Sequence, residues 1–320
     1  MSKALDILKL YWKHDSFRSL QEDIINSVVE ENDTFALMPT GGGKSICFQV
    51  PAMLNDGLCL VISPLVALMK DQVENLQNKG IKAIALTGGI HENEIVELLD
   101  NCQYGNYKFL YLSPERLQND WILERIKNFN INLIAIDEAH CVSQWGNDFR
   151  PAYLKINLLK EYFPKVPFLA LTATATPRVQ KDIIEKLALK NCQIFTKSFA
   201  RENLAYMVFT VEDKLFLTQQ ILKKNPEPSI IYVTNRKSCI EISSQLEKLG
   251  FTTTYYHGGL MPKEKENHMN LWMKEKVQVI VATNAFGMGI DKANVKTIIH
   301  LHLPSNLENY YQEAGRAGRN

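Results

Sequence analysis

Two short segments of the chain carry residue types whose spacing suits nucleotide chemistry. The first is Met38-Pro-Thr-Gly-Gly-Gly-Lys-Ser45, and the second is Ile136-Asp-Glu-Ala-His140. A glycine-rich turn followed by a lysine and a serine can present backbone N–H groups, an ammonium and a hydroxyl to a triphosphate and its magnesium. Asp137 can hold the magnesium ion, and Glu138 can accept a proton from the attacking water. Together the two segments predict a site for nucleotide hydrolysis.

Taken one at a time, the two segments also have structural interpretations. Three glycines in a row are more typical of an ordinary turn, and an isolated Asp-Glu pair is usually solvated surface. Met38 also stands where the usual phosphate-loop pattern has glycine. The surrounding elements favour the nucleotide site, because residues 35–38 predict a strand before the loop and residues 45–50 predict a helix after it. Residues 133–136 predict a buried strand that ends at Asp137, and open α/β sheets bind ligands at the carboxyl ends of strands.

Short apolar runs alternate with helix-like segments along the whole chain, which is typical of parallel β-α-β architecture. The runs are rich in Val, Ile and Leu, as expected for strands covered on both faces. They predict strands at residues 35–38, 58–63, 109–113, 133–137, 168–172, 229–233, 253–257, 277–283 and 297–301. We therefore expect an α/β fold with two similar halves, residues 1–200 and 201–320. The break in the pattern between Phe195 and Met207 is the expected linker.

Composition limits the class of protein. With 320 residues, 46% of them hydrophobic, the chain can bury substantial cores, and no apolar run approaches the roughly 18 residues that cross a membrane. The six cysteines include no Cys-x-x-Cys pair, so we expect reduced thiols, an intracellular location and no structural zinc. The formal net charge of +1 means that any nucleic-acid binding depends on a local groove.

Only the first half has a phosphate loop, so the second half is expected to serve the same site. Its last segment, residues 310–319, places Arg316 and Arg319 three residues apart, on one face if the segment is helical. An arginine that reaches a γ-phosphate from a neighbouring domain can raise the rate by about 10³–10⁵. We therefore predict catalytic roles for both arginines, although an ordinary surface pair would be favoured if this segment stood alone.

In this order, the segments resemble the helicase core of RecQ-family DNA helicases, within helicase superfamily 2, over essentially all of the chain. The matching segments are residues 17–21, 40–45, 63–73, 112–116, 136–140, 141–151, 171–176, 232–236, 257–259, 281–291 and 310–319. The resemblance implies two tandem RecA-like domains, each a mostly parallel sheet flanked by helices, with ATP and Mg²⁺ in the cleft between them.

The resemblance also implies further nucleotide contacts. Gln21 would hydrogen-bond adenine, which suits an amide that donates and accepts at once, and Arg18 would lie close to the base. Gly289 and Asp291 would lie near the nucleotide, and Arg319 would take the arginine-finger position. The loop residues in contact with phosphate or magnesium would be Thr40, Gly41, Gly42, Gly43, Lys44 and Ser45, with Ser45 and Asp137 as the magnesium ligands.

A DNA-binding surface follows from the same resemblance. Residues 141–151 are similar to the aromatic-rich loop of the family, in which aromatic side chains stack on unpaired bases at about 1–3 kcal/mol per base. The polar neighbours of Trp145 and Phe149 argue against burial of these rings, and the loop directly follows Glu138, so it could report DNA to the hydrolytic site. The predicted DNA-binding residues are Ser63, Lys70, Arg116, Trp145, Phe149, Arg150, Thr234, His257 and Thr283.

Three departures from the family pattern matter. Lys13-His14 stands where the family commonly has a Gly-aromatic pair, so stacking on adenine would fall to His14. Asn147 stands where the aromatic-rich loop commonly has a histidine, which removes a titratable group. Longer relatives continue past the position of Asn320 into a zinc-binding module and a winged helix, so this chain is expected to be the helicase core alone.

The sequence therefore predicts an ATP-dependent 3′–5′ DNA helicase or translocase that couples Mg-ATP hydrolysis to movement on single-stranded DNA in repair or recombination. Expected partners are single-stranded DNA and single-strand/duplex junctions, with no membrane and a monomeric state. The expected location is the cytoplasm of a bacterium or the nucleus of a eukaryote. Two alternatives stay open. One is an RNA helicase of the DEAH type, which has the same acidic box, and the other is a core that binds ATP and DNA but unwinds poorly.

Overall fold

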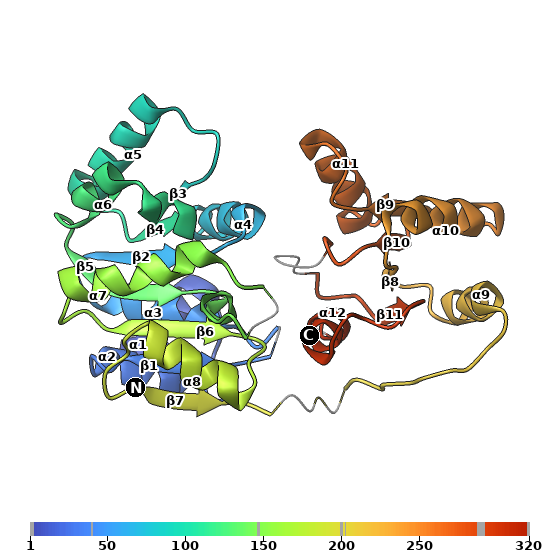
Figure 1. Cartoon of the computed structure of the whole chain (residues 1–320), viewed down its shortest axis with the longest axis horizontal. Helices are drawn as coiled ribbons and strands as arrows, with labels where there is room; N and C mark the ends of the chain where they lie inside the picture. Colours follow the sequence, from blue (N-terminus) through green and yellow to red (C-terminus); the bar gives the residue numbers. More distant parts are fainter. Residues whose placement is uncertain are drawn as a thin grey trace. The chain divides into compact units, whose positions relative to one another are not determined.

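The computed structural model describes residues 3–39, 41–145, 148–198, 201, 203–286 and 292–318. The chain divides into two compact units, Met1–Phe199 and Ala200–Asn320, each built on one parallel sheet (Figure 1). Among the described residues, none of the helices is both long and apolar enough to cross a membrane.

Unit 1 has a seven-stranded sheet in the order β3-β4-β2-β5-β6-β1-β7, in which all neighbouring strands are parallel. The strands are β1 (Thr34–Leu37), β2 (Leu58–Ile62), β3 (Ala83–Leu86), β4 (Phe109–Leu112), β5 (Ile131–Ile136), β6 (Phe168–Thr172) and β7 (Gln193–Thr196). Successive side chains of a strand point to opposite faces. Accordingly, Phe35 and Leu37 of β1 pack into one core, and Ala36 and Met38 pack into the other. Burial on both faces explains why these strands read as continuous apolar runs.

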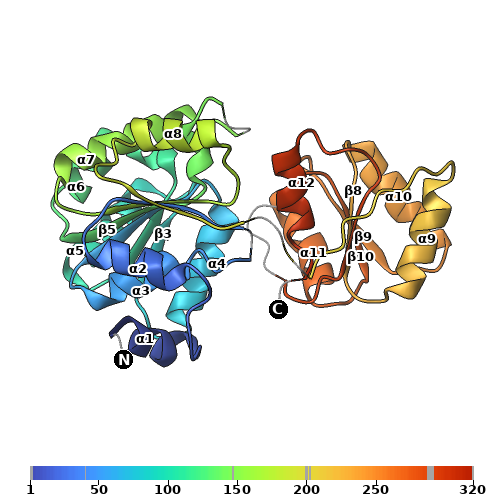
Figure 2. The ribbon, with the colours of Figure 1, turned by 90° about the horizontal axis from the view of Figure 1, so that it is seen from below.

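Helices cover both faces of this sheet, with α2 and α3 on one side and α7 and α8 on the other (Figure 2). The helices are α1 (Lys3–Ile7), α2 (Gln21–Val29), α3 (Ile46–Leu54), α4 (Val66–Gln77), α5 (Glu92–Tyr104), α6 (Asp120–Ile126), α7 (Leu158–Tyr162) and α8 (Pro177–Lys186). A π-helical turn, η1 (Leu8–Trp12), and three 3₁₀ turns, η2 (Pro114–Gln118), η3 (Ala139–Val142) and η4 (Pro151–Asn157), complete the unit.

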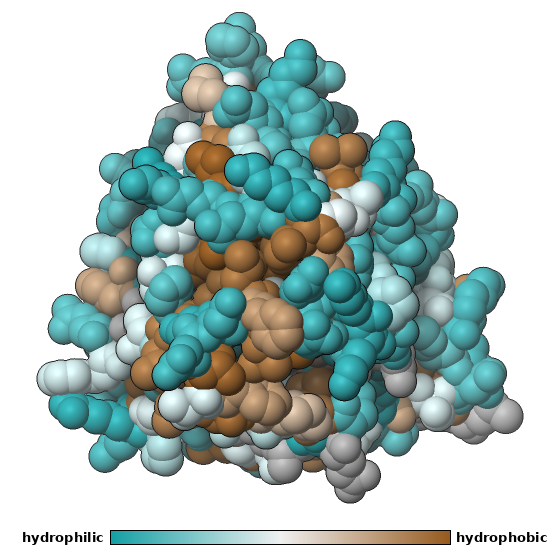
Figure 3. All heavy atoms as spheres, turned by 90° about the vertical axis from the view of Figure 1, so that its right-hand side faces the viewer, coloured by the Kyte–Doolittle hydropathy of each residue, from teal (hydrophilic) through white to brown (hydrophobic). Residues whose placement is uncertain are grey.

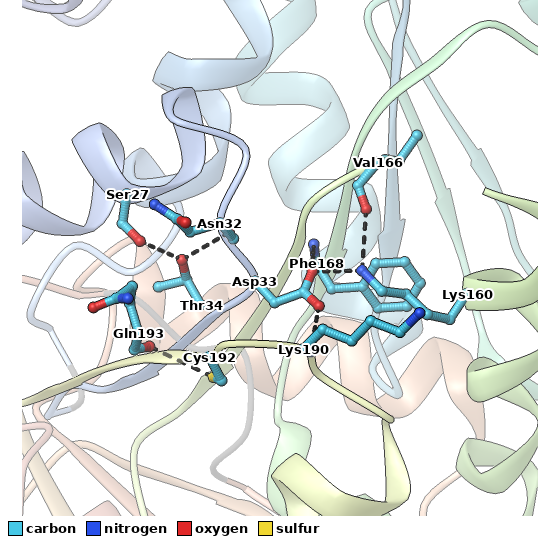
Figure 4. A network of polar contacts seen from close by, with 10 residues as sticks. All are labelled: Ser27, Asn32, Asp33, Thr34, Lys160, Val166, Phe168, Lys190, Cys192 and Gln193. Atoms are coloured by element: carbon cyan, nitrogen blue, oxygen red, sulfur yellow. Dashed lines mark hydrogen bonds and ion pairs between the residues drawn. The ribbon is translucent and has the colours of Figure 1, made fainter. Parts of the chain in front are cut away.

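A buried ion pair joins three segments at the amino-terminal ends of β1 and β6 (Figure 4). Lys160 Nζ donates to Asp33 Oδ1 at 2.5 Å and lies 4.5 Å from the centre of the Phe168 ring. The backbone N–H groups of Phe168 and Lys190 also donate to the Asp33 carboxylate, at 3.0 and 2.7 Å. A buried charge is tolerated when it is paired and hydrogen-bonded in this way. The pair thus anchors unit 1 at the amino-terminal ends of these strands, opposite the ends that lead to the phosphate loop.

Unit 2 has a four-stranded parallel sheet in the order β11-β8-β10-β9. One core lies on each face of it, and Trp272 and Phe286 are fully buried in the core on the α11 side. The elements are α9 (Lys214–Lys224), β8 (Ser229–Tyr232), α10 (Arg236–Lys248), β9 (Thr253–Tyr256), α11 (Pro262–Met273), β10 (Val279–Ala282), β11 (Thr297–His300) and α12 (Leu307–Ala314).

All nine predicted strands are confirmed, with ends that shift by one or two residues, but β3 and β7 were not predicted. The start of the expected linker was wrong. Phe195 belongs to β7, which pairs with β1 along the edge of the sheet. The side chains of β7 are largely exposed, so the strand lacks the buried apolar run that identified the others.

Candidate nucleotide and nucleic-acid site

The phosphate loop and the acidic segment leave the same edge of the unit 1 sheet. The loop follows β1, and Asp137 follows β5, with β6 between the two strands. All three strands are parallel, so their carboxyl ends lie together at the edge where α/β sheets bind ligands. The helix predicted after the loop is confirmed as α3, which begins at Ile46.

Glycine is required at two positions of the loop. Gly43 has a φ of +74°, and a Cβ built there would lie 2.4 Å from Nε2 of Gln21. A Cβ on Gly42 would lie 2.9 Å from the carbonyl oxygen of Pro39. The loop backbone is therefore held in a tight turn that side chains would fill, as a phosphate cradle requires.

Gln21 closes onto this loop. Its amide Nε2 donates to the carbonyl oxygens of Gly43 at 3.0 Å and Gly42 at 3.4 Å, and its Oε1 accepts from the backbone N–H of Arg18 at 2.8 Å. Arg18 Nη1 donates to the carbonyl oxygen of Gly41 at 2.9 Å. Gln21 is buried, so its donor and acceptor both serve the protein itself. Adenine recognition by Gln21 stays a prediction, and it would require the amide to exchange these bonds for bonds to the base.

Lys44, Glu138 and His140 form a chain of charged groups behind the loop. Lys44 Nζ lies 3.8 Å from Glu138 Oε1, and His140 Nδ1 lies 3.3 Å from Glu138 Oε2. His140 Nδ1 also lies 2.9 Å from Oγ1 of Thr172, at the end of β6. Burial opposes the protonated form of His140, but hydrogen bonding to Cys141 and Glu138, together with the Glu138 charge, raises its pKa to about 10. Glu138 therefore lies between two cationic groups.

Asp137 is a buried carboxyl group at the end of β5. Burial and then the neighbouring Glu138 charge raise the pKa of Asp137 to about 6, against the effect of Lys44. Its Oδ1 accepts from the backbone N–H of Glu138 at 3.0 Å, and the hydroxyl of Tyr153 donates to its backbone oxygen at 3.0 Å. A cation would favour the ionised carboxylate of Asp137, and the Ser45 hydroxyl at the start of α3 is the second predicted ligand. Magnesium takes one or two protein ligands plus phosphate oxygens, so this donor set fits it.

Glu138 has backbone angles of φ 48° and ψ 46°, in the left-handed region that non-glycine residues rarely occupy. Such a conformation costs of order 1–3 kcal/mol and is concentrated at functional sites. It turns the chain from β5 into η3 within one residue, so that Asp137, Glu138 and His140 stay at the strand end.

The aromatic-rich loop packs along one stripe of α8. The Arg178 guanidinium carbon lies 3.5 Å above the ring of Trp145, which is 59% exposed. Asp182 Oδ2 accepts from the Ser143 hydroxyl at 2.5 Å, and Lys186 Nζ lies 5.8 Å from the ring of Phe149. The three α8 residues are spaced by four, so they lie on one helical face. The prediction that Trp145 is not buried is confirmed, whereas Phe149 is half-buried.

The other predicted DNA contacts of unit 1 differ in exposure. Lys70 on α4 is exposed, and Ser63 is buried with no hydrogen bond to its hydroxyl among the described residues. Arg116 donates to the carbonyl oxygen of Thr87. Arg150 donates to the carbonyl oxygen of Pro64 at 3.4 Å. These two arginines therefore help to hold neighbouring loops in place.

Unit 2 brings its predicted DNA contacts to one edge. His257 directly follows β9, Thr283 directly follows β10, and Thr234 lies two residues past β8, all at the carboxyl edge of the sheet. Thr234 is exposed, while His257 and Thr283 are buried. The buried Nδ1 of His257 has no hydrogen-bond partner among the described residues. An unpaired buried nitrogen is costly, which is consistent with a ligand contact at that position.

Arg316 and Arg319 were expected to share a face only if their segment is helical, and this condition is not met at Arg316. Helix α12 ends at Ala314, and Arg316 lies in the turn that follows, 5% exposed. Gly315 and Gly318 provide that turn, because glycine disfavours helix continuation. Predicted residues Thr40, Gly289, Asp291 and Arg319 lie outside the described residues. His14 is exposed and follows Lys13, whose φ of 58° is the left-handed conformation that glycine adopts most readily.

The first half of the chain matches a known protein family. Residues 18–183, more than half of the 320, match the family model described as DEAD/DEAH box helicase. The chain belongs to this family. Residues 213–320 of this DEAD/DEAH box helicase match a second model, the helicase conserved C-terminal domain.

Within the family, the chain matches the helicase core of RecQ-type proteins. It is 41% identical to the ATP-dependent DNA helicase RecQ of Bacillus subtilis, over 100% of this chain and 54% of that protein. It is 43% identical to the ATP-dependent DNA helicase Q-like 4B of Arabidopsis thaliana, over 99% of this chain and 29% of that protein. The chain thus spans about half or less of the length of these two curated relatives.

Solved structures show the same fold. The helicase MrfA bound to DNA superposes with a TM-score of 0.80 at 19% identity, covering 100% of this chain and 50% of that one. Dbp5 of S. cerevisiae bound to RNA and ADP BeF3 superposes with a TM-score of 0.77 at 18% identity, covering 100% of this chain and 85% of that one. The two units of this helicase are tandem RecA-like α/β domains with parallel sheets, as predicted.

Several residues of the site were not identified from the sequence. His140 stands within the acidic segment, but its contacts with Glu138 and Thr172 depend on the turn at η3. Arg178 and Asp182 are polar residues spaced by four on α8, but nothing in the sequence connects them with the aromatic-rich loop.

Proposed function

We propose that this chain is the motor core of an ATP-dependent DNA helicase or translocase of RecQ type, which couples Mg-ATP hydrolysis to movement along single-stranded DNA in repair or recombination. The observation that carries the proposal is the arrangement of Lys44, Asp137 and Glu138 beyond the carboxyl ends of β1 and β5, with Lys44 Nζ 3.8 Å from Glu138 Oε1. The identity to RecQ-type DNA helicases over nearly the whole chain supports DNA as the polymer.

Each group of the unit 1 site has a chemical role in the proposal. ATP and Mg²⁺ would supply the transferable phosphoryl group and the charge that stabilises it. The loop amides and Lys44 would hold the phosphates, and Ser45 and Asp137 would orient the metal. Lys44 would exchange its contact with Glu138 for the phosphates, which leaves Glu138 to take the proton of the attacking water.

Unit 2 would supply the remaining contacts. We infer that Arg316 and Arg319 act on the nucleotide phosphates and that Gly289 and Asp291 also serve the nucleotide. Thr234, His257 and Thr283, at one edge of the unit 2 sheet, would bind DNA phosphates, as would Ser63, Lys70 and Arg116 in unit 1. Phosphate contacts carry no sequence information, so recognition would be of DNA structure.

The aromatic-rich loop favours single-stranded DNA as the ligand of the motor. The exposed ring of Trp145 offers a stacking surface, and the loop is joined to Glu138 through η3. A base that displaces Arg178 from Trp145 would move a segment only a few residues from the hydrolytic carboxylate. Binding of DNA and hydrolysis of ATP would thus be coupled within unit 1.

Steady-state ATP hydrolysis tests the proposal, measured with single-stranded DNA, with matched RNA and with no nucleic acid. DNA alone is expected to stimulate turnover. Equal stimulation by RNA would instead favour an RNA helicase of the DEAH type. A low rate under all three conditions, with ATP-dependent DNA binding retained, would favour a core that binds both ligands and unwinds poorly. Strand displacement from duplexes with 3′ or 5′ tails tests the expected 3′–5′ direction.

Glu138→Gln separates a motor from a binding module. Removal of the proposed base is expected to lower kcat by about 10²–10⁴ while ATP still binds. The matched control is Glu161→Gln, at an exposed glutamate on α7. A variant at Glu138 that hydrolyses ATP like the control would contradict the proposed role.

A further inference from the structure

The segment at the start of unit 2 makes several contacts with the turn that contains Arg316. We call residues 201 and 203–206 the entry segment; they precede α9 and have no helix or strand of their own. Their side chains contact α12 and the turn at residues 315–318, which lie more than 100 positions further along the chain. The entry segment therefore contacts the last elements described in unit 2, helix α12 and the turn that follows it.

Arg201 provides the main contacts. Its Nη1 donates to the carbonyl oxygen of Gly315 at 3.2 Å, and its Nη2 donates to the carbonyl oxygen of Gly318. Asn203 Nδ2 donates to the same Gly318 oxygen at 2.7 Å, while Asn203 Oδ1 accepts from Arg201 Nη2 at 3.3 Å. One guanidinium thus holds both ends of a four-residue turn, and Asn203 fixes the plane of that guanidinium.

The turn is shaped to accept these two side chains. Gly318 has a φ of +62°, and its N–H donates to the carbonyl oxygen of Val295 at 3.1 Å. A Cβ on Gly318 would lie 2.8 Å from Asn203 Nδ2 and 3.1 Å from a methyl carbon of Leu204. Glycine is therefore needed at this position both for its backbone conformation and for the approach of the entry segment.

The aromatic side chain of Tyr206 extends the contact onto α12. Its ring centre lies 5.8 Å from that of Tyr310 and 6.3 Å from that of Tyr311. Aromatic pairs at such distances prefer tilted or edge-to-face arrangements, which both pairs show. The entry segment thus holds the helix as well as the turn behind it.

Arg201 supplies donors to carbonyl oxygens at the end of α12 and in the turn behind it. The last carbonyl groups of a helix lack intrahelical partners, so those near Gly315 need donors from elsewhere. A guanidinium has several N–H donors in one rigid plane, which suits it to hold two carbonyl oxygens at once. Because Arg316 lies inside the turn, the position of the turn sets where the backbone of Arg316 lies.

We propose that Arg201 and Asn203 are positioning residues for the arginines of the last motif, Arg316 and Arg319. This inference rests on the proposed function, in which those arginines act on ATP. Arg201 and Asn203 do not touch the nucleotide in this account. They fix the backbone from which the arginines reach it, so their loss should slow catalysis without weakening the binding of ATP to unit 1.

The kinetic test uses the whole 320-residue chain. Arg201→Ala is expected to lower the DNA-stimulated kcat by about 10²-fold, the cost of misplacing a catalytic group by about 1 Å, with KM for ATP and Kd for single-stranded DNA unchanged. Arg201→Lys should retain more activity than Arg201→Ala, because an ammonium keeps the charge but not the paired geometry. Lys224→Ala, at an exposed lysine of α9, is the control and should match the wild type.

The reciprocal change comes from the turn. Gly318→Ala would push Asn203 away and strain the backbone, so it should reproduce the slow turnover of Arg201→Ala with ATP affinity retained. An Arg201→Ala variant with normal kcat would overturn the proposal. So would a variant that loses ATP and DNA binding together with kcat, because that result indicates only general damage to the fold.

Amide hydrogen exchange keeps the test independent of activity. Arg201→Ala should speed exchange at the amides of residues 316–318, but not at those of β8 or β10, while Lys224→Ala should change neither. If the wild type shows no turnover while Arg201→Ala still speeds exchange at the turn, the proposed function fails. In that case the entry segment still holds the turn in place. Unchanged exchange at residues 316–318 would overturn the positioning role whatever the turnover.

Discussion

The two units have similar sheets but hold their candidate residues in different ways. In unit 1, Gln21, Lys44, Asp137 and His140 all have polar partners within the site itself. In unit 2, Thr234 is exposed and the buried Nδ1 of His257 has no partner among the described residues. Hydrolysis requires groups that are placed before the ligand arrives, whereas contacts to a DNA backbone can form on binding.

The surfaces of the two units also differ in the number of large apolar residues that they expose. Unit 2 is the shorter unit, yet it has more of the large apolar residues that are exposed in the described parts of the chain. Figure 3, which looks toward the side of unit 2, shows apolar residues gathered in the middle of that face. The exposed large apolar residues in the described part of unit 2 are Tyr206, Met207, Val208, Phe209, Val211, Phe216, Ile240, Leu249, Met261, Leu271, Leu303, Leu307 and Tyr311. Unit 1 thus buries its large apolar residues more completely than unit 2 in the described parts of the chain.

The largest expected effect concerns the buried ion pair. Lys160→Met should destabilise unit 1 by about 3–5 kcal/mol, because it leaves the Asp33 carboxylate buried without its partner. The matched change in unit 2 is Lys292→Met, which leaves Glu275 in water and should cost far less. Urea denaturation of both variants, followed by circular dichroism, measures the difference. Equal losses of stability would contradict this contrast between the two ion pairs. The double variant Asp33→Leu with Lys160→Met should recover part of the stability that Lys160→Met loses.

Lys44→Ala should strongly slow hydrolysis at the unit 1 site. Loss of a fixed positive charge at the developing phosphate charge is expected to lower kcat by about 10²–10³. Thr234→Ala in unit 2 should instead raise Kd for single-stranded DNA by a few-fold and leave basal hydrolysis unchanged. Steady-state kinetics and DNA titration of both variants test this contrast. Basal turnover that falls as far in Thr234→Ala as in Lys44→Ala would break it.

The third prediction concerns pH. The raised pKa of Asp137, about 6, means that its carboxylate is ionised above that pH and takes up a proton as the pH falls. Protons and Mg²⁺ would then compete for the same oxygens. The Mg²⁺ concentration that gives half-maximal hydrolysis should rise as the pH falls below about 6, approaching tenfold per pH unit. Measurements at pH 5 and pH 7.5 decide the matter, and a requirement that does not change with pH would exclude Asp137 as a metal ligand.

The smallest predicted effect is on the aromatic-rich loop. Arg178→Ala removes the cation above Trp145, a contact worth about 0.5–1 kcal/mol at an exposed site, and frees the ring for a base. Single-stranded DNA should therefore bind about two- to fivefold more tightly. Lys181→Ala, at an exposed neighbour on α8, is the control. Weaker binding in Arg178→Ala than in the control would mean that Arg178 itself contacts DNA.

The sequence predicted most of what depends on burial and on strand ends. Strands buried on both faces were identified by their apolar runs, and the rule that ligands bind at carboxyl ends predicted that Lys44 and Asp137 share one site. Strand β7 was missed because its side chains are exposed at the sheet edge. Helix α12 ends at Ala314, directly before Gly315, a residue type that disfavours helix continuation.

Side-chain partners that are distant in the sequence were beyond prediction. Gln21 lies more than 20 positions from Gly43, and Arg201 lies 114 positions from Gly315. No pattern of types or spacing identifies such pairs, because they are set by how whole elements pack. Sequence patterns therefore indicated which residues belong to the site, and the structure was needed to show which residues hold them.

The edge strand β7 has a mechanical consequence. It is the last strand of unit 1 and runs parallel to β1, with Lys197 N–H bonded to the carbonyl oxygen of Leu37 at 2.9 Å, so the chain leaves unit 1 beside the phosphate loop. A force that pulls this exit along the strand loads the whole ladder between β1 and β7 in shear rather than opening its bonds one at a time. If the proposed function is right, a pull on this exit meets the ladder in its most resistant geometry, next to the proposed nucleotide site.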